Sequence, residues 1–174
     1  GLSYYKERGF SAETIKKFQL GYGPKQKDAL SKEALKSSFQ MKYLEDSGLS
    51  IVKNESAFDR FIERMMFPIH SFSGRVLGFG GRTLQKGNKA KYVNSPESLV
   101  YLKSKILYGI YFAKQHISKL NNCYIVEGYT DVISLYQAGV ENVVSSSGTS
   151  LTSEQIKLIN RFTKNITILF DGDA

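Results

Sequence analysis

Three short apolar runs in the last third of the chain, separated by two amphipathic helical segments, constrain the fold more than any other feature. The runs are Tyr124–Val126, Val140–Ser145 and Ile166–Phe170. They are rich in β-branched and aromatic residues, which is typical of strands buried on both faces. The order β-α-β-α-β predicts a parallel sheet, because right-handed crossovers return each strand in the same direction.

Acidic residues follow the first and last of these runs directly. Because the carboxyl ends of parallel strands meet at one edge, we expect Glu127, Asp171 and Asp173 to lie together there. Asp131 is expected just inside the following helix. Two carboxylates about 4.5 Å apart repel by roughly 3–4 kcal/mol at an effective dielectric of about 20, so such a cluster scatters, shifts its pKa values or binds a cation. Oxygen ligands alone favour Mg²⁺ or Mn²⁺, and the alternative is that the acids only end strands and cap helices.

The composition is that of a globular protein, with 41% hydrophobic and 13% aromatic residues among 174. No apolar run approaches the length of a membrane span and the first residues show no signal-peptide pattern, so we expect a cytoplasmic protein with no membrane contact. The single cysteine, Cys123, excludes an intramolecular disulfide and a cysteine-built zinc site. We expect it to be a small buried hydrophobic residue.

The net charge of +8 is unevenly distributed along the chain. Residues 1–120 contain 21 basic and 10 acidic residues, whereas residues 121–174 contain 3 basic and 6 acidic residues. A basic region beside an acidic cluster suits a polyanion that is led toward bound cations, as a nucleic acid or a nucleotide would be. The alternative is a solvated, lysine-rich face.

Local patterns predict further helices and one hairpin. Ser11 is a predicted N-cap and Thr152 with Gln155 a predicted capping box. The hairpin is predicted to turn at Ser73–Gly74. The predicted helices are Leu2–Lys6, Ser11–Leu20, Asp28–Phe39, Met41–Asp46, Gly109–Leu120, Asp131–Gln137 and Thr152–Arg161, and the hairpin strands are Met65–Ile69 and Arg75–Gly80.

Several other features have two readings. Gly78, Gly80 and Gly81 indicate close approach of a ligand, of another backbone, or of tightly packed neighbours. Aromatic residues interleaved with lysines between Tyr101 and Lys114 could stack bases, but at helical spacing they more often pack in a core. The serine-rich loop 145–149 offers hydroxyl and N–H groups for a phosphate or for a turn. The two histidines, His70 and His116, lack metal-ligand spacing and are read as structural or surface residues.

An ordered series of motifs gives the chain a family resemblance over essentially its whole length. It resembles the RNA-polymerase core of bacterial replicative primases of the DnaG type. The last two motifs resemble the glutamate and Asp-x-Asp motifs of the TOPRIM fold, which topoisomerases and nucleases share. The motifs are Tyr5–Ser11, Asp59–Phe61, Phe67–Ile69, Gly78–Arg82, Lys91–Glu97, Glu127–Val132 and Asp171–Asp173.

The resemblance implies an α+β fold in two parts. A basic, mixed N-terminal subdomain would cover residues 1–120, and an incomplete α/β TOPRIM subdomain with a parallel sheet would cover residues 121–174. The implied function is DNA-directed synthesis of short RNA primers during DNA replication, by metal-dependent nucleotidyl transfer. The implied partners are a single-stranded DNA template, ribonucleoside triphosphates and the RNA–DNA hybrid product.

Site residues are also implied by the resemblance. Glu127, Asp171 and Asp173 would be catalytic, and together with Asp131 they would hold Mg²⁺ or Mn²⁺. The implied nucleotide or DNA contacts are Arg8, Arg82, Lys91, Tyr92, Asn94 and Lys103. These cationic and polar side chains suit phosphates rather than base reading.

Departures from the family pattern define the alternatives. The family's zinc-binding module is not represented, so no zinc is expected, and the replicative helicase would bind through a domain absent here. Because the sequence stops at Ala174, directly after Asp173, we expect weak or no primer synthesis by this fragment alone. The alternatives are a metal-independent module that binds single-stranded nucleic acid, and a TOPRIM nuclease or topoisomerase.

Overall fold

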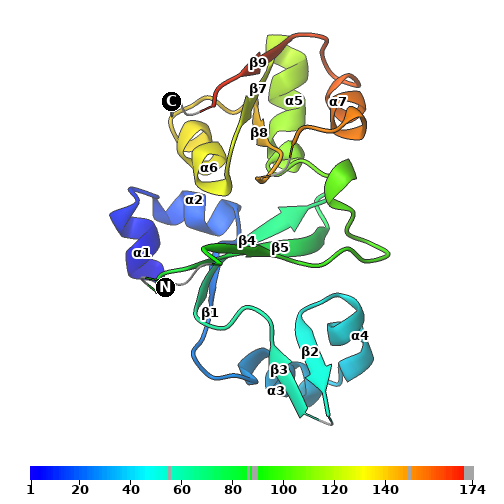
Figure 1. Ribbon diagram of the computed structural model, residues 1–174. Helices are drawn as coiled ribbons and strands as arrows, with labels where there is room; N and C mark the ends of the chain where they lie inside the picture. The colour runs from blue at the N-terminus through cyan, green and yellow to red at the C-terminus, as the bar shows by residue number, and fades with distance from the viewer. Residues whose placement is uncertain (55, 86, 88–89, 149, 171–174) are drawn as a thin grey trace.

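The computed structural model describes residues 1–54, 56–85, 87, 90–148 and 150–170. Three groups of elements are stacked along one direction (Figure 1). A parallel sheet with three helices lies at one end, an antiparallel sheet with two short helices lies in the middle, and a small lobe of two helices and a hairpin lies at the other end. The chain therefore has the mixed α+β fold that the sequence predicted.

The parallel sheet consists of β7 (Cys123–Val126), β8 (Val143–Ser145) and β9 (Ile166–Ile168) in the order β8-β7-β9. Both neighbours of β7 pair with it in parallel, which confirms the β-α-β-α-β prediction. Alternate residues of β7 enter two different cores, since successive side chains of a strand point to opposite faces. Val126 packs in the core that contains α6 (Tyr129–Gln137), whereas Cys123 and Ile125 pack against α5 (Ile110–Leu120) and α7 (Ser153–Ile159).

Helix α5 belongs to the second core by its contacts. Its residues Ile110, Ala113 and Ile117 are buried with Cys123 and Ile125. The predicted boundary between subdomains at residue 120 separates α5 from the sheet on which it packs, and this boundary stays a prediction. Cys123 is fully buried, and burial raises the pKa of its thiol to about 12, as fits a small hydrophobic residue.

The antiparallel sheet lies next to this region and has the strand order β1-β4-β5-β6. Its central pair is the predicted hairpin, with the turn where Ser71 N donates to Arg75 O at 2.7 Å. The two edge strands were not predicted, because each has only three residues and neither shows an alternating apolar pattern. The strands are β1 (Gly21–Gly23), β4 (Arg64–His70), β5 (Val76–Thr83) and β6 (Tyr92–Asn94).

Two short helices cover one face of this sheet. They are α1 (Leu2–Glu7) and α2 (Ala12–Lys17), and the predicted cap of α2 is confirmed because Ser11 Oγ accepts from Thr14 N at 3.1 Å. Tyr5 of α1 is buried, and its hydroxyl donates to the backbone carbonyls of Gly21 and Met66. The N-terminal helix is thereby fixed to β1 and β4.

The small lobe contains α3 (Ala29–Lys36), α4 (Met41–Asp46), β2 (Ser50–Lys53) and β3 (Ser56–Asp59). The hairpin β2–β3 was not predicted from its charged sequence. The carboxylate of Asp59 accepts from the backbone N–H groups of Leu30 and Ser31, at 2.7 and 3.0 Å. A carboxylate at this position satisfies unpaired donors at the start of α3 and favours its dipole.

The aromatic residues between Tyr101 and Lys114 settle mostly into the core. Tyr101 and Tyr108 are 2% and 1% exposed, so the packing alternative is correct for them. Phe112 packs against Phe18 of the same core, with ring centroids 4.5 Å apart.

Within the described residues, no helix combines the length and apolarity that a membrane crossing needs.

Candidate active site

The carboxyl end of β7 is the centre of the candidate site. Glu127 follows this strand directly, and its backbone carbonyl accepts from Ser145 Oγ of β8 at 2.6 Å. Asp131 is in the first turn of α6, where its Oδ2 accepts from Gly128 N at 2.9 Å. Both acidic side chains are exposed at the sheet edge where the sequence placed them. Asp171 and Asp173 lie outside the described residues.

Tyr129, two residues after Glu127, joins this edge to the antiparallel sheet. Its ring stacks on Phe67 of β4 at 5.3 Å and meets the edge of Tyr108 at 4.7 Å. Its hydroxyl donates to Asn94 Oδ1 of β6 at 2.7 Å. Burial raises the pKa of Tyr129 to about 12, so the hydroxyl remains a proton donor at neutral pH.

Gly80 of β5 provides the space for this ring. A Cβ atom at Gly80 would lie 2.4 Å from Cε2 of Tyr129. At Gly78 and Gly81 the nearest neighbours are likewise side chains, those of Ser95 and Phe61. Among the alternatives for these glycines, the described contacts therefore favour tight packing.

Cations and aromatic rings alternate along one side of the site. The guanidinium of Arg8 lies 5.5 Å from the centroid of the Tyr4 ring, and the guanidinium of Arg82 lies 5.2 Å from the same ring and 5.8 Å from Tyr92. We call Arg8, Tyr4, Arg82 and Tyr92 the cationic row. The row ends next to the buried tyrosine of α6, because the rings of Tyr92 and Tyr129 are 6.2 Å apart.

Arg82 has unused hydrogen-bonding capacity. Its Nε and Nη1 atoms are buried, and neither has a hydrogen-bond partner among the described residues. Arginine presents its donors in a planar fork that matches the oxygens of a phosphate. A buried donor without an acceptor costs free energy, so among the predicted contacts this guanidinium is the clearest candidate for binding an anion.

A small hollow joins Asn94 and Lys103 to the serine loop after β8. It has a volume of about 10 Å³ and is also lined by Ser146 and Ser147. Ser147 N donates to Ser145 Oγ at 2.8 Å, so this part of the loop forms a turn. The backbone of Lys103 is held beside this hollow by the side chain of Glu97, since Lys103 N donates to Glu97 Oε1 at 3.0 Å.

Of the six predicted nucleotide or DNA contacts, Arg8, Arg82 and Tyr92 belong to the cationic row, whereas Asn94 and Lys103 line the small hollow. Lys91 is exposed at the entry to β6, and its carbonyl accepts from Thr83 N. Tyr129 and Tyr4 were missed by the sequence analysis. The position of Tyr129 between two acids inside a recognised motif was the available signal, whereas no pattern marks Tyr4.

The two histidines have structural partners, as predicted. His70 Nε2 lies 2.8 Å from Gln19 Oε1, and its ring packs on Tyr111 and Phe112. His116 Nδ1 lies 2.9 Å from Glu141 Oε2.

The donor chemistry of the site fits a hard divalent cation. Its candidate ligands Glu127, Asp131, Asp171 and Asp173 are all carboxylates, which suit Mg²⁺ and Mn²⁺. Within the part of the chain that the structure describes, histidine, cysteine, aspartate and glutamate form no group of three or more that could hold a metal ion. Of the four candidate ligands, Glu127 and Asp131 belong to that part of the chain, whereas Asp171 and Asp173 lie beyond residue 170.

Comparison with known proteins identifies the family. Residues 1–114 match the family model described as DNA primase catalytic core, N-terminal domain. This chain belongs to that primase family. Residues 124–174 match a second model, described as Toprim-like, which confirms the resemblance and the fold expected of the parallel sheet.

Individual relatives agree with the primase assignment. The DNA primase of Halalkalibacterium halodurans is 45% identical over 177 residues, which cover 100% of this chain and 29% of that protein. The RNA polymerase domain of Mycobacterium tuberculosis primase DnaG superimposes with a TM-score of 0.92 at 38% identity, covering 98% of this chain and 58% of that domain. A DnaG primase catalytic domain bound to single-stranded DNA gives a TM-score of 0.88 at 42% identity, covering 98% and 53%.

The chain therefore spans less than a third of the length of this curated relative. The two family models cover residues 1–114 and 124–174, and the matched segments contain the cationic row and the carboxylate edge, by which we mean Glu127 and Asp131 at the carboxyl end of β7.

Proposed function

We propose that this primase chain contributes the template- and nucleotide-binding part of a site that synthesises RNA primers on single-stranded DNA. The observation that carries the proposal is the contact between Tyr129 and Asn94, at 2.7 Å across Gly80. It holds the carboxyl end of β7, where Glu127 lies, beside the strand that bears Tyr92 and Asn94. The proposed anion-binding groups and the carboxylates would thereby lie on two sides of one site.

The cationic row would bind phosphates of the template or of the ribonucleoside triphosphate. Arg82 has two buried donor nitrogens without acceptors among the described residues, and phosphate oxygens would accept hydrogen bonds from them. Tyr92 is 41% exposed beside it and can stack on a base or sugar. The single-stranded DNA named for one solved relative supports a polynucleotide as the ligand.

The carboxylate edge would supply the chemistry. Glu127 and Asp131, with Asp171 and Asp173, would hold Mg²⁺ or Mn²⁺, which would supply the positive charge that a triphosphate and the transferred phosphoryl group require. The backbone of Glu127 is fixed by Ser145, and its side chain remains exposed toward solvent. These carboxylates would therefore act by their position around the metal ion and by their negative charge.

Calorimetry of Mn²⁺ binding tests the metal part of the proposal. We expect the chain to bind Mn²⁺ and expect Glu127→Gln and Asp171→Asn to abolish the binding heat, because each removes one oxyanion ligand. Glu45→Gln is the matched control, since Glu45 is an exposed acid on the distant helix α4. Absence of binding in the unmutated chain would contradict metal binding by these carboxylates.

Anisotropy of a labelled oligothymidine tests the template part, with and without Mg²⁺. Binding that weakens on Arg82→Met and on added salt supports the cationic row as the template contact. Affinity that is unchanged by Mg²⁺, in a chain that binds no Mn²⁺, would favour a metal-independent nucleic-acid-binding module. Incubation with template, ribonucleoside triphosphates and Mn²⁺ completes the test, because DNA cleavage without ribonucleotide incorporation would favour a nuclease.

A further inference from the structure

The antiparallel sheet has two faces, and the candidate active site uses one of them. Met65 and Phe67 of β4 are fully buried on the face that receives Tyr129. Met66 and Pro68, which alternate with them along β4, point to the opposite face, since successive side chains of a strand alternate. A solvated second face of an antiparallel sheet is normally polar, whereas this one is apolar.

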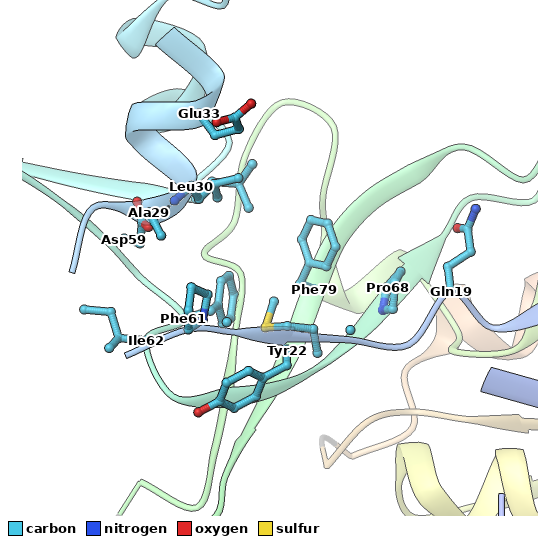
Figure 2. Close-up of a pocket in the computed structure, with 15 residues that line it drawn as sticks. Gln19, Tyr22, Ala29, Leu30, Glu33, Asp59, Phe61, Ile62, Pro68 and Phe79 are labelled. Carbon is cyan, nitrogen blue, oxygen red and sulfur yellow. Dashed lines mark hydrogen bonds between the residues drawn. The ribbon is translucent and has the colours of Figure 1, made fainter. Parts of the chain in front are cut away.

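A cavity of about 490 Å³ lies on that second face. The sheet provides one wall through Pro68 and Phe79, and α3 provides the opposite wall through Leu30 and Glu33, as Figure 2 shows. Phe79 precedes Gly80 on β5, so the sheet separates the cavity from the Tyr129 contact. Its volume and apolar lining are those of a small-molecule site.

The polar side chains that line the cavity differ in how strongly they are already engaged by hydrogen bonds or ion pairs. The carboxylate of Asp59 is engaged by the first N–H groups of α3 and by the hydroxyl of Ser31. The Oε1 atom of Gln19 is engaged by His70. Glu33 has an ion-pair contact with Lys36 at 4.0 Å, and both side chains are more than 70% exposed, so this contact neutralises the carboxylate weakly.

The lining therefore combines a large apolar wall with one exposed carboxylate, that of Glu33, while the carboxylate of Asp59 is buried and hydrogen-bonded. An apolar molecule gains free energy by leaving water for such a wall. A cationic group at one end of that molecule can meet the carboxylate of Glu33 while it remains hydrated. An anionic group would be repelled at the same position.

We propose that this cavity binds a small amphipathic amine, with an aromatic or aliphatic body against Pro68, Phe79 and Leu30 and its ammonium group next to Glu33. The site is separate from the primase chemistry, because it lies on the other face of the sheet. A bound molecule would connect α3 of the small lobe to the central sheet. Binding would consequently protect the lobe from local opening.

A pair of probes with one shape and opposite charge tests the proposal: 4-phenylbutylamine and 4-phenylbutyrate. We expect the amine to shift the amide resonances of Tyr22, Leu30, Glu33 and Phe79 in the ¹⁵N-labelled chain, with a Kd on the order of millimolar for a ligand of this size. We expect the butyrate to bind at least about fivefold more weakly. The net charge of +8 would favour the butyrate at a non-specific site, so preference for the amine identifies a local carboxylate.

Two variants and one control complete the test. Glu33→Gln should weaken binding of the amine about two- to fivefold, because the pair would be solvent-exposed. Ala29→Phe should abolish binding of both probes by filling the cavity that Ala29 lines. Glu45→Gln on α4 should change nothing. Equal binding of the two probes, shifts outside the lining residues, or unchanged binding in Glu33→Gln would each overturn the proposal.

Discussion

The hydroxyl of Tyr129 donates a hydrogen bond to Asn94 Oδ1 at 2.7 Å, across 35 residues of sequence. Tyr129 is 3% exposed and opens α6, while Asn94 ends β6. The bond therefore connects the parallel sheet to the antiparallel sheet at the edge where Glu127 lies. Together with the stacking of Tyr129 on Phe67, it is one of the contacts that join the two walls of the candidate site.

Tyr129→Phe removes this bond and keeps the ring. We expect the free energy of unfolding to fall by about 0.5–1.5 kcal/mol, the usual net value of a hydrogen bond. A double-mutant cycle with Asn94→Ala, followed by urea unfolding, should give a coupling energy of similar size. Tyr43→Phe is the control, because Tyr43 is 60% exposed on α4. Additive effects of the two substitutions would show that the bond contributes nothing.

Gly80→Ala tests the space beneath the same ring. The added Cβ would lie 2.4 Å from Cε2 of Tyr129, so the ring or the strand must move. Overpacking of this kind costs about 1–3 kcal/mol, and urea unfolding should show it.

The matched control for that substitution is Gly21→Ala, where the new Cβ would meet Met66 Cβ at an ordinary 3.8 Å. We expect its effect to stay within about 1 kcal/mol. In a Tyr129→Ala background the cost of Gly80→Ala should disappear. A cost that persists there would assign the need for glycine to the backbone of β5 instead.

The parallel sheet could be predicted because its apolar runs are rich in β-branched and aromatic residues and alternate with amphipathic helical patterns. The runs 123–126 and 166–170 are each preceded by an asparagine and followed by an acid, and helical patterns lie between them. The strands β1 and β6 could not be predicted, since three residues such as Gly21–Gly23 carry no period. Their conformation comes from pairing with the β4–β5 hairpin, which is a tertiary effect.

The site was predictable to the extent that charge and motif reveal it. Glu127 and Asp131 lie at the expected edge, and Arg82 and Tyr92 lie together. The role of Tyr129 was not predicted, because a tyrosine at helical spacing more often packs in a core and nothing in the sequence names its partner. Only the structure shows that its ring occupies the space left by a glycine of another sheet.

Arg82→Met is expected to weaken binding of single-stranded DNA while it changes the free energy of unfolding only slightly. Removing two buried donor nitrogens that lack acceptors among the described residues relieves about 1–3 kcal/mol, whereas losing the contacts with the rings of Tyr4 and Tyr92 costs about 1–2 kcal/mol. These effects oppose each other, so the free energy of unfolding should change by less than about 1.5 kcal/mol.

Binding of single-stranded DNA by this variant should weaken clearly. The slope of log K against log salt should decrease in magnitude by about 0.7 if Arg82 contacts one phosphate. Lys42→Gln, an exposed cation on α4, serves as the control and should leave the slope unchanged. An unchanged slope in Arg82→Met would remove Arg82 from the phosphate contacts.

The buried imidazole of His70 is expected to make the free energy of unfolding depend on pH. Burial lowers the pKa of its imidazole below the ordinary value of 6.5, and its neighbours are Gln19, Tyr111 and Phe112 rather than an acid. The unfolded chain therefore takes up the proton first as the pH falls. The contribution of neutral His70 is fully present above pH 6.5 and is lost progressively below it, until the folded state is protonated too.

Urea unfolding at about pH 7.5 and pH 5.5 measures this loss. The decrease in stability between the two pH values should be smaller in His70→Gln than in the unmutated chain, since glutamine does not titrate. The matched control is His116→Gln, which removes a histidine that lies beside Glu141 and is partly exposed. If the unmutated chain and His70→Gln lose the same stability, proton uptake by His70 is not the cause, and other groups must carry the acid sensitivity.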